Sequence, residues 1–247
     1  MNSDYKVNTI NWFFGRGLSI ECNLSWTVPK TWTYPYPCIS RDFKISMIKF
    51  ALEKEMNKSS VDCQIINDFL DTLSSNTKDN FNHRFITTNW DYLLQSEILN
   101  RGFKIKPSWL DDSHVFHLNG TIENLENNTN RSPFLLEEDL ATERTPSCEA
   151  NKIYNNLIWN KLFIVVGMSF ECDTDRFFLN ALHKVEDDLL IGKSIWIIIN
   201  PNEDALNKSS QRIQDALPSA KIRKINKSFK QWVNYDLINF MKKIQSE

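Results

Sequence analysis

Short apolar runs that end in polar or glycine residues recur along the chain and predict buried β-strands. They are rich in β-branched and aromatic side chains, which favour strands. Two of them, LFIVVG and SIWIIIN, are almost uniformly apolar, as is typical of central parallel strands that are covered on both faces. The predicted strands are Trp12–Gly15, Phe85–Thr88, Val115–Leu118, Leu162–Gly167, Ser194–Asn200 and Ala220–Ile225.

Amphipathic helices alternate with the later strands. Apolar positions with helical spacing predict helices over Thr174–Asp188, Ala205–Leu217 and Phe229–Ile244. Such alternation favours parallel strands joined by right-handed crossovers. We therefore predict a single α/β domain over residues 1–247, with a Rossmann-like, mostly parallel sheet and helices on both faces.

Two segments interrupt this alternation and are predicted to be insertions. Residues from about 21 to 82 contain a proline-bearing loop followed by helices, one of them over Ser59–Leu73, whereas residues 123–151 are polar and rich in Asn and Glu. Neither segment resembles a separate domain. Ligands of open α/β sheets bind beyond the carboxyl ends of the strands, so we expect helical and loop insertions to cover a site there.

Composition excludes several classes of function. The net charge of −2 gives no overall basic field for nucleic acid, and we interpret the basic group Lys221, Arg223, Lys224 and Lys227 as a solvated edge. The five cysteines form no C-x-x-C pair, so we expect no metal and no disulfide framework. The stretch MNSDYKVNTINWFF lacks the basic head and apolar core of a secretory signal, and no apolar run approaches about 18 residues. We expect a cytoplasmic protein that contacts no membrane.

The first group of candidate site residues follows the first predicted strand, in FFGRGLS. Gly15, Gly17 and Ser19 follow the strand directly. Glycine permits a close backbone approach, and successive amides at a helix start can hold a diphosphate. The pattern lacks the full G-x-G-x-x-G fingerprint. A plain tight turn is therefore an equally good interpretation.

Further candidate residues follow the other predicted strands. Thr88, Asn89 and Asp91 leave the second strand in TTNWD, where an Asn or Asp that caps the next helix is the simpler alternative. His117 and Asn119 in FHLNG are two residues apart, so in an extended chain both point to one face. A histidine in a strand is more often a satisfied core residue. The remaining strand-end candidates are Gly167, Ser169 and Asn200.

In this order the segments resemble the sirtuin-like family, and specifically its bacterial branch of NAD glycohydrolases in antiphage defence. FFGRGLS resembles that family's G-A-G-x-S loop, TTNWD its T-T-N-[YF]-D motif and FHLNG its H-L-H-G motif. VVGMSFECDTD is similar to the G-[YF]-S-[FL] element, and IIINPNE to the late strand that ends in Asn-Pro. The resemblance covers nearly the whole chain, from about Trp12 to Trp232.

The chain departs from this family at three points. It cannot supply the four-cysteine zinc module of deacylating sirtuins, which argues against protein deacylation. Arg16 replaces a small residue in the glycine loop. Asn119 occupies the position of the family's catalytic histidine, and an amide cannot take up a proton at neutral pH, whereas the other histidine of the motif, His117, is retained.

The resemblance implies NAD as a substrate that is cleaved to nicotinamide and ADP-ribose, with Asn89, Asp91, His117 and Asn119 as catalytic residues. It also implies an antiviral role by NAD depletion. Because such an activity would harm the host and the chain is short, we expect control by homo-oligomerisation or by a partner sensor protein. The alternative is a degenerate module that binds NAD or ADP-ribose, or only a partner. The residues that would bind the substrate are Gly15, Arg16, Gly17, Ser19, Thr88, Gly167, Ser169 and Asn200.

Overall fold

The computed structural model describes residues 9–26, 40–77, 81–101, 115–119, 122, 157, 161–183 and 193–246. Within these residues lies one six-stranded sheet in the order β3-β2-β1-β4-β5-β6. All its strand pairs are parallel, so the predicted α/β fold is confirmed and the described sheet is parallel throughout. The strands are β1 (Thr9–Phe14), β2 (Asn82–Thr87), β3 (Val115–His117), β4 (Leu162–Val166), β5 (Ile195–Ile199) and β6 (Lys221–Ile225).

The strand order places a topological switch point between β1 and β4. The chain starts at β1 and moves outward to β2 and β3, then returns to β4 on the other side of β1 and continues to β5 and β6. Phe14 at the end of β1 is level with Thr87 of β2 and Val166 of β4. The loops after these three strands therefore leave one edge of the sheet together, where ligands of Rossmann-like folds bind.

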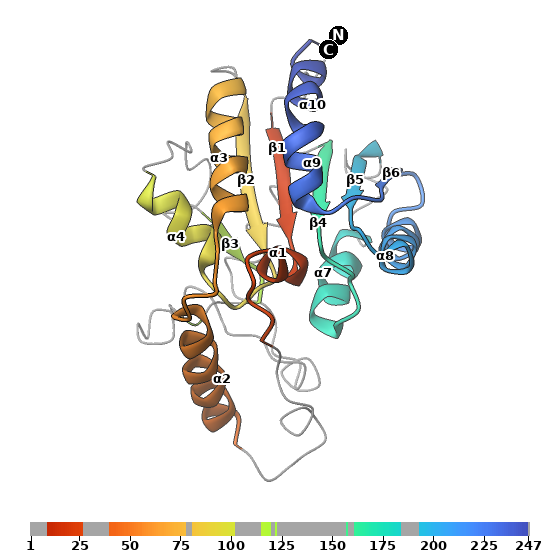
Figure 1. Cartoon of the computed structure of the whole chain (residues 1–247). Helices are drawn as coiled ribbons and strands as arrows, with labels where there is room; N and C mark the ends of the chain where they lie inside the picture. The colour runs from red at the N-terminus through yellow and green to blue at the C-terminus, as the bar shows by residue number, and fades with distance from the viewer. Residues whose placement is uncertain are drawn as a thin grey trace.

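Helices cover both faces of the sheet, because alternate residues of each strand point to opposite sides. Trp12 and Phe14 pack into a core with α3, α9 and α10, whereas Phe13 packs into a second core with α7 and α8. Figure 1 shows α3, α9 and α10 side by side across one face. The described helices are α1 (Arg16–Glu21), α2 (Arg41–Met56), α3 (Gln64–Asn76), α4 (Leu93–Asn100), α7 (Asp173–His183), α8 (Glu203–Ala216), α9 (Phe229–Tyr235) and α10 (Leu237–Ile244).

The segment 21–82 is only partly an insertion. Its helix α3 packs on the sheet and contacts α9 and α10, so it is the crossover between β1 and β2. It begins at Gln64, not at Ser59 as predicted, because the Asp62 carboxylate accepts the Gln64 amide at 2.9 Å and the preceding turn is not helical. Helix α2 does lie beyond the end of the sheet to which the strands point (Figure 1). The second predicted insertion, 123–151, lies outside the described residues.

The C-terminal part of the chain differs from its predicted structure in one detail. The predicted helix Phe229–Ile244 divides at Asp236 into α9 and α10, and the Asp236 carboxylate accepts a hydrogen bond from Lys227 at 2.6 Å.

On the edge strand β6, Lys221, Arg223 and Lys224 are exposed. Cations at an exposed edge discourage pairing with another strand, which agrees with the interpretation of this group as a solvated edge.

A buried histidine links β2 to β1 and α3. The indole Nε1 of Trp12 donates to Nδ1 of His83 at 3.0 Å, and the Thr77 hydroxyl donates to the Leu73 carbonyl at 2.6 Å. The remaining lone pairs of that hydroxyl accept Nε2–H of His83 at 2.8 Å. His83 is therefore a neutral imidazole with both nitrogens paired, and burial lowers its pKa to about 4.

We expect the free energy of unfolding to fall as the pH drops from about 6.5 towards 4. In that window the unfolded imidazole binds a proton and the folded one does not, so the unfolded state is favoured. The loss from His83 alone is about 2 kcal/mol between pH 7 and pH 5. Urea unfolding at both pH values measures it.

The variant His83→Gln should show a smaller pH dependence than the wild type, and His183→Gln is the matched control because His183 is exposed. Equal pH dependence in His83→Gln and the wild type would show that His83 is not the buried neutral group inferred here.

Candidate functional site

The side-chain amide of Asn89 joins the loops after β1 and β2. Its Nδ2 donates to the Gly15 carbonyl at 3.1 Å and to the Ser19 hydroxyl at 2.9 Å. A backbone carbonyl only accepts hydrogen bonds, so these contacts fix which end of the amide is nitrogen. Among the described residues none donates to Oδ1 of this half-buried side chain. The amide therefore presents a fixed acceptor at the switch point.

The Ser19 hydroxyl links Asn89 to the buried carboxylate of Asp91. This hydroxyl accepts from Asn89 and donates to Oδ2 of Asp91 at 2.7 Å. Burial raises the pKa of Asp91, and the Ser19 hydroxyl and the Leu93 amide oppose that shift by donating to the ionised form. The Leu93 amide lies 3.3 Å from Oδ1, so Asp91 also satisfies a donor at the start of α4. The interpretation of Asp91 as a residue at the helix start therefore has a structural basis, and its role as a site residue stays a prediction.

His117 and Asn119 both contact the backbone of the TTNWD segment. Nδ1 of His117 lies 3.1 Å from the Asn89 carbonyl, to which it donates, and Nδ2 of Asn119 donates to the Thr88 carbonyl at 3.3 Å. Burial lowers the pKa of His117 to about 4, so the imidazole is neutral at pH 7. With the proton on Nδ1, its Nε2 carries the lone pair.

The three glycines of the site bring two backbones into contact. The amides of Gly15 and Gly17 donate to the carbonyls of Val166 and Gly167, each at 2.9 Å. A Cβ on Gly17 would lie 2.5 Å from Cα of Gly167, and one on Gly15 would lie 2.6 Å from Cα of Met168. These amides are already paired within the protein, contrary to the expectation that they would bind a diphosphate.

Three predicted site residues stand apart from this network. Arg16 is exposed, and its guanidinium donates to the Ser25 carbonyl at 3.4 Å. Ser169 follows β4, and its carbonyl accepts from Arg212 of α8 at 2.7 Å. Asn200 follows β5, and its Oδ1 accepts the Asn202 amide at 2.9 Å. They lie after β1, β4 and β5 respectively, but no hydrogen bond among the described residues joins them to Asn89.

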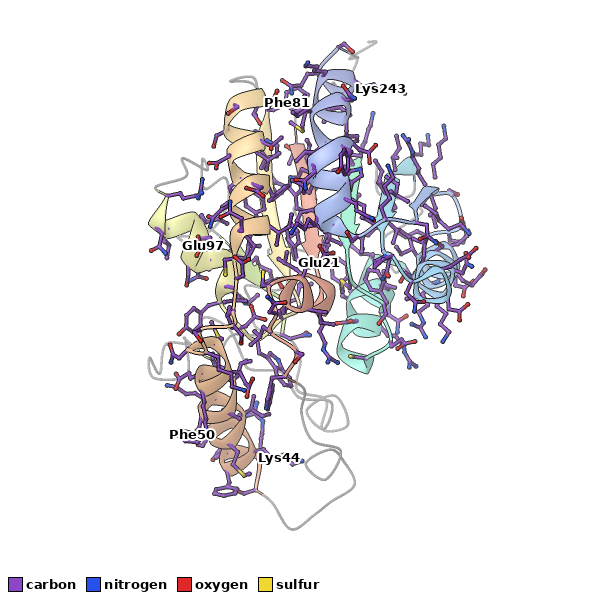
Figure 2. All side chains as sticks on the ribbon, in the orientation of Figure 1. Glu21, Lys44, Phe50, Phe81, Glu97 and Lys243 are labelled. Atoms are coloured by element: carbon purple, nitrogen blue, oxygen red, sulfur yellow. The ribbon has the colours of Figure 1, made fainter. Side chains whose placement is uncertain are left out.

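Two residues that support the site were missed in the sequence. The Thr87 hydroxyl donates to the Phe14 carbonyl at 2.9 Å and accepts the Asn89 amide at 3.0 Å, so it holds the loop that carries Asn89. Glu21, labelled in Figure 2, lies at the end of α1. Its carboxylate accepts the amides of Phe229 and Lys230 at 2.6 and 2.8 Å. Such capping of α9 joins residues remote in sequence, and no local pattern predicts it.

No protein-family model matches the chain, and no curated protein matches it significantly. The described parts of the chain hold no cluster of three or more His, Cys, Asp or Glu residues suited to a metal ion. None of the helices in those parts is long and apolar enough to cross a membrane. Any assignment of function therefore rests on the motifs and on the geometry of the strand-end loops.

We expect Gly167→Ala to lower the free energy of unfolding by more than about 2 kcal/mol. Gly167 has φ +58°, and its Cβ would lie 2.4 Å from Cα of Gly17, so both the backbone conformation and the packing oppose a side chain. Urea unfolding measures the loss, with Ser75→Ala on the exposed side of α3 as a control. A Gly167→Ala protein as stable as that control would contradict the glycine contact.

Proposed function

We propose that this protein is an NAD glycohydrolase that cleaves the nicotinamide–ribose bond to give nicotinamide and ADP-ribose. The observation that carries the proposal is the anchored amide of Asn89 at the switch point between β1 and β4. The backbone carbonyl of Asn89 accepts from the neutral imidazole of His117, and both residues belong to motifs that resemble those of the sirtuin-like family. The order of these motifs along the chain supports the same assignment.

The reaction replaces the bond from the ribose C1′ to the nicotinamide nitrogen with a bond from C1′ to water oxygen, and it releases a proton. Nicotinamide leaves as a neutral group, so the transition state is a cation on the ribose, and positioning matters more than a strong acid. Oδ1 of Asn89 accepts a hydrogen bond from the water or a ribose hydroxyl. The Asp91 carboxylate supports Asn89 through Ser19 and contributes negative charge near the developing cation.

His117 and the more distant strand ends complete the proposed substrate site. Nε2 of His117 is buried in the structure, and the proposal requires that substrate binding brings a ribose hydroxyl to its lone pair. The exposed guanidinium of Arg16 replaces the paired glycine amides as the donor to the diphosphate. The end of β4, at Gly167 and Ser169, and Asn200 at the end of β5 meet the adenosine half, while Thr88 lines the ribose side.

A second candidate function is a catalytically degenerate module that binds NAD or ADP-ribose, or docks a partner. One observation favours it: the side chain at the position of the family's catalytic histidine is Asn119, and its Nδ2 is bonded to the Thr88 carbonyl at 3.3 Å. This amide holds the backbone of the TTNWD segment and supplies no base. In the first candidate function, His117 and Asn89 must therefore act without it.

The proposed activity implies control in the cell. A cytoplasmic enzyme that depletes NAD harms its host, so we propose an antiviral role in which the enzyme stays inactive until it is triggered. The control is exerted by homo-oligomerisation or by a partner sensor protein. A monomer that is fully active on its own would contradict this part of the proposal.

We expect Asn89→Ala to reduce nicotinamide release by at least about 100-fold. The substitution removes both the acceptor Oδ1 and the hydrogen bonds from Nδ2 to the Gly15 carbonyl and the Ser19 hydroxyl. The assay follows nicotinamide by chromatography after incubation of NAD with the purified chain, alone and at concentrations that drive assembly. The control is Asn239→Ala, because Asn239 is exposed on α10, and it should retain wild-type activity.

Retained activity in Asn89→Ala would exclude the proposed role of the amide. Calorimetry separates the remaining outcomes. NAD bound without turnover under every condition supports the degenerate module. If neither NAD nor ADP-ribose binds, the glycohydrolase and the nucleotide-binding module are both contradicted, and only a module that docks a partner is left.

The variant Asn119→His tests whether the site lacks only its base. If the module is degenerate, the new imidazole supplies a proton acceptor beside Thr88, and nicotinamide release should rise from undetectable to measurable. If the wild type is already an enzyme, the same substitution should change its rate by less than about 10-fold. Suppose that Asn119→His binds NAD as tightly as the wild type does but releases no nicotinamide. This result would contradict the assignment of this position to the reaction, whether or not the wild type is active.

A further inference from the structure

Two cysteines that are distant in sequence lie side by side next to the candidate site. Cys22 follows α1 and is buried, whereas Cys63 precedes α3 and is half-buried. The Asp62 amide donates to the Cys22 carbonyl at 2.9 Å, which holds the two chain segments together. Cys63 packs against the apolar core cluster that contains Cys22, and an interaction between the two thiols shifts their pKa values in opposite directions. Neither cysteine has a neighbour in sequence that would reveal the pair.

The two thiols have different environments and therefore different reactivity. The interaction with Cys22 lowers the pKa of Cys63, although burial and the carboxylates of Glu97, Asp62 and Asp91 oppose that shift. The position of Cys63 at the N-cap of α3 also favours a thiolate. For Cys22, the same interaction and then burial raise the pKa. Cys63 is thus the nucleophilic thiol and Cys22 its protonated neighbour.

We propose that Cys22 and Cys63 form a reversible disulfide when the protein meets hydrogen peroxide. The Cys63 thiolate attacks one peroxide oxygen, the O–O bond breaks, and hydroxide leaves, so that Cys63 becomes a sulfenic acid. The Cys22 sulfur then attacks the Cys63 sulfur, and the sulfenic oxygen leaves as water with the Cys22 proton. Two thiols are oxidised and one peroxide is reduced to two waters.

The disulfide would act next to the candidate site. Cys22 is one turn beyond Ser19, and its amide donates to the Ser19 carbonyl at 3.1 Å. Ser19 in turn donates to Asp91, whose negative charge raises the pKa of both thiols. The bond closes the chain segment that contains α2, which lies beyond the end of the sheet (Figure 1). Oxidation therefore joins the end of α1 covalently to the start of α3. The chain between Cys22 and Cys63, which includes α2, becomes a closed loop.

Peptide mapping of the full chain tests the proposal independently of NAD turnover. After treatment with hydrogen peroxide and alkylation, mass spectrometry should find a peptide that joins Cys22 to Cys63, and dithiothreitol should release it. The oxidised chain should also melt at a temperature higher by about 5 °C, because the bond restricts the unfolded chain. In Cys22→Ser the sulfenic acid of Cys63 should persist long enough to react with dimedone.

The control variant is Cys172→Ser, since Cys172 is exposed and lies after β4; it should form the same bond. Peroxide that leaves Cys22 and Cys63 as thiols, over-oxidises Cys63 without a crosslink or joins either to another cysteine would overturn the proposal. If the disulfide is mapped but the chain turns over no NAD, the disulfide proposal is supported and only the proposed function fails.

Discussion

The contact between the backbones of Gly17 and Gly167 is the constraint on which the rest of the site depends. It forms at the switch point, where α1 leaves β1 and meets the loop after β4, and it is closed by the hydrogen bond from the Gly17 amide to the Gly167 carbonyl. Side chains at these positions would separate the two elements. Because Ser19 lies only two residues beyond Gly17, this contact also determines how closely the Ser19 hydroxyl approaches Asp91 and Asn89.

The polar residues near that contact have two different roles. Ser19 and Asp91 are buried and bond to each other, to Asn89 and to backbone, so they position and polarise rather than meet a ligand directly. Asn89 and His117 use one polar atom for anchoring, at Nδ2 and Nδ1, which determines the chemistry of the other. Glu21 lies on the same helix, α1, as Ser19, and its carboxylate accepts two amides at the start of α9.

The sequence predicted the sheet well because its strands are short, apolar and separated by polar breakers. The six strands of the described sheet lie within three residues of their predicted bounds, and the clustering of Asn89, Asp91 and His117 followed from parallel strand ends. The crossover α3 was hidden behind a long loop, so the segment 21–82 read as an insertion. The pairing of the glycine amides and of Cys22 with Cys63 depends on contacts between distant segments, and local patterns do not encode them.

A crystal structure of the chain with ADP-ribose would test the central claim most directly, because that claim is geometric. The account predicts the terminal ribose at the switch point, with a hydroxyl or an ordered water in hydrogen-bonding contact with Oδ1 of Asn89, and the diphosphate near Arg16. ADP-ribose bound at another face of the molecule, or with its ribose away from both Asn89 and His117, would contradict it.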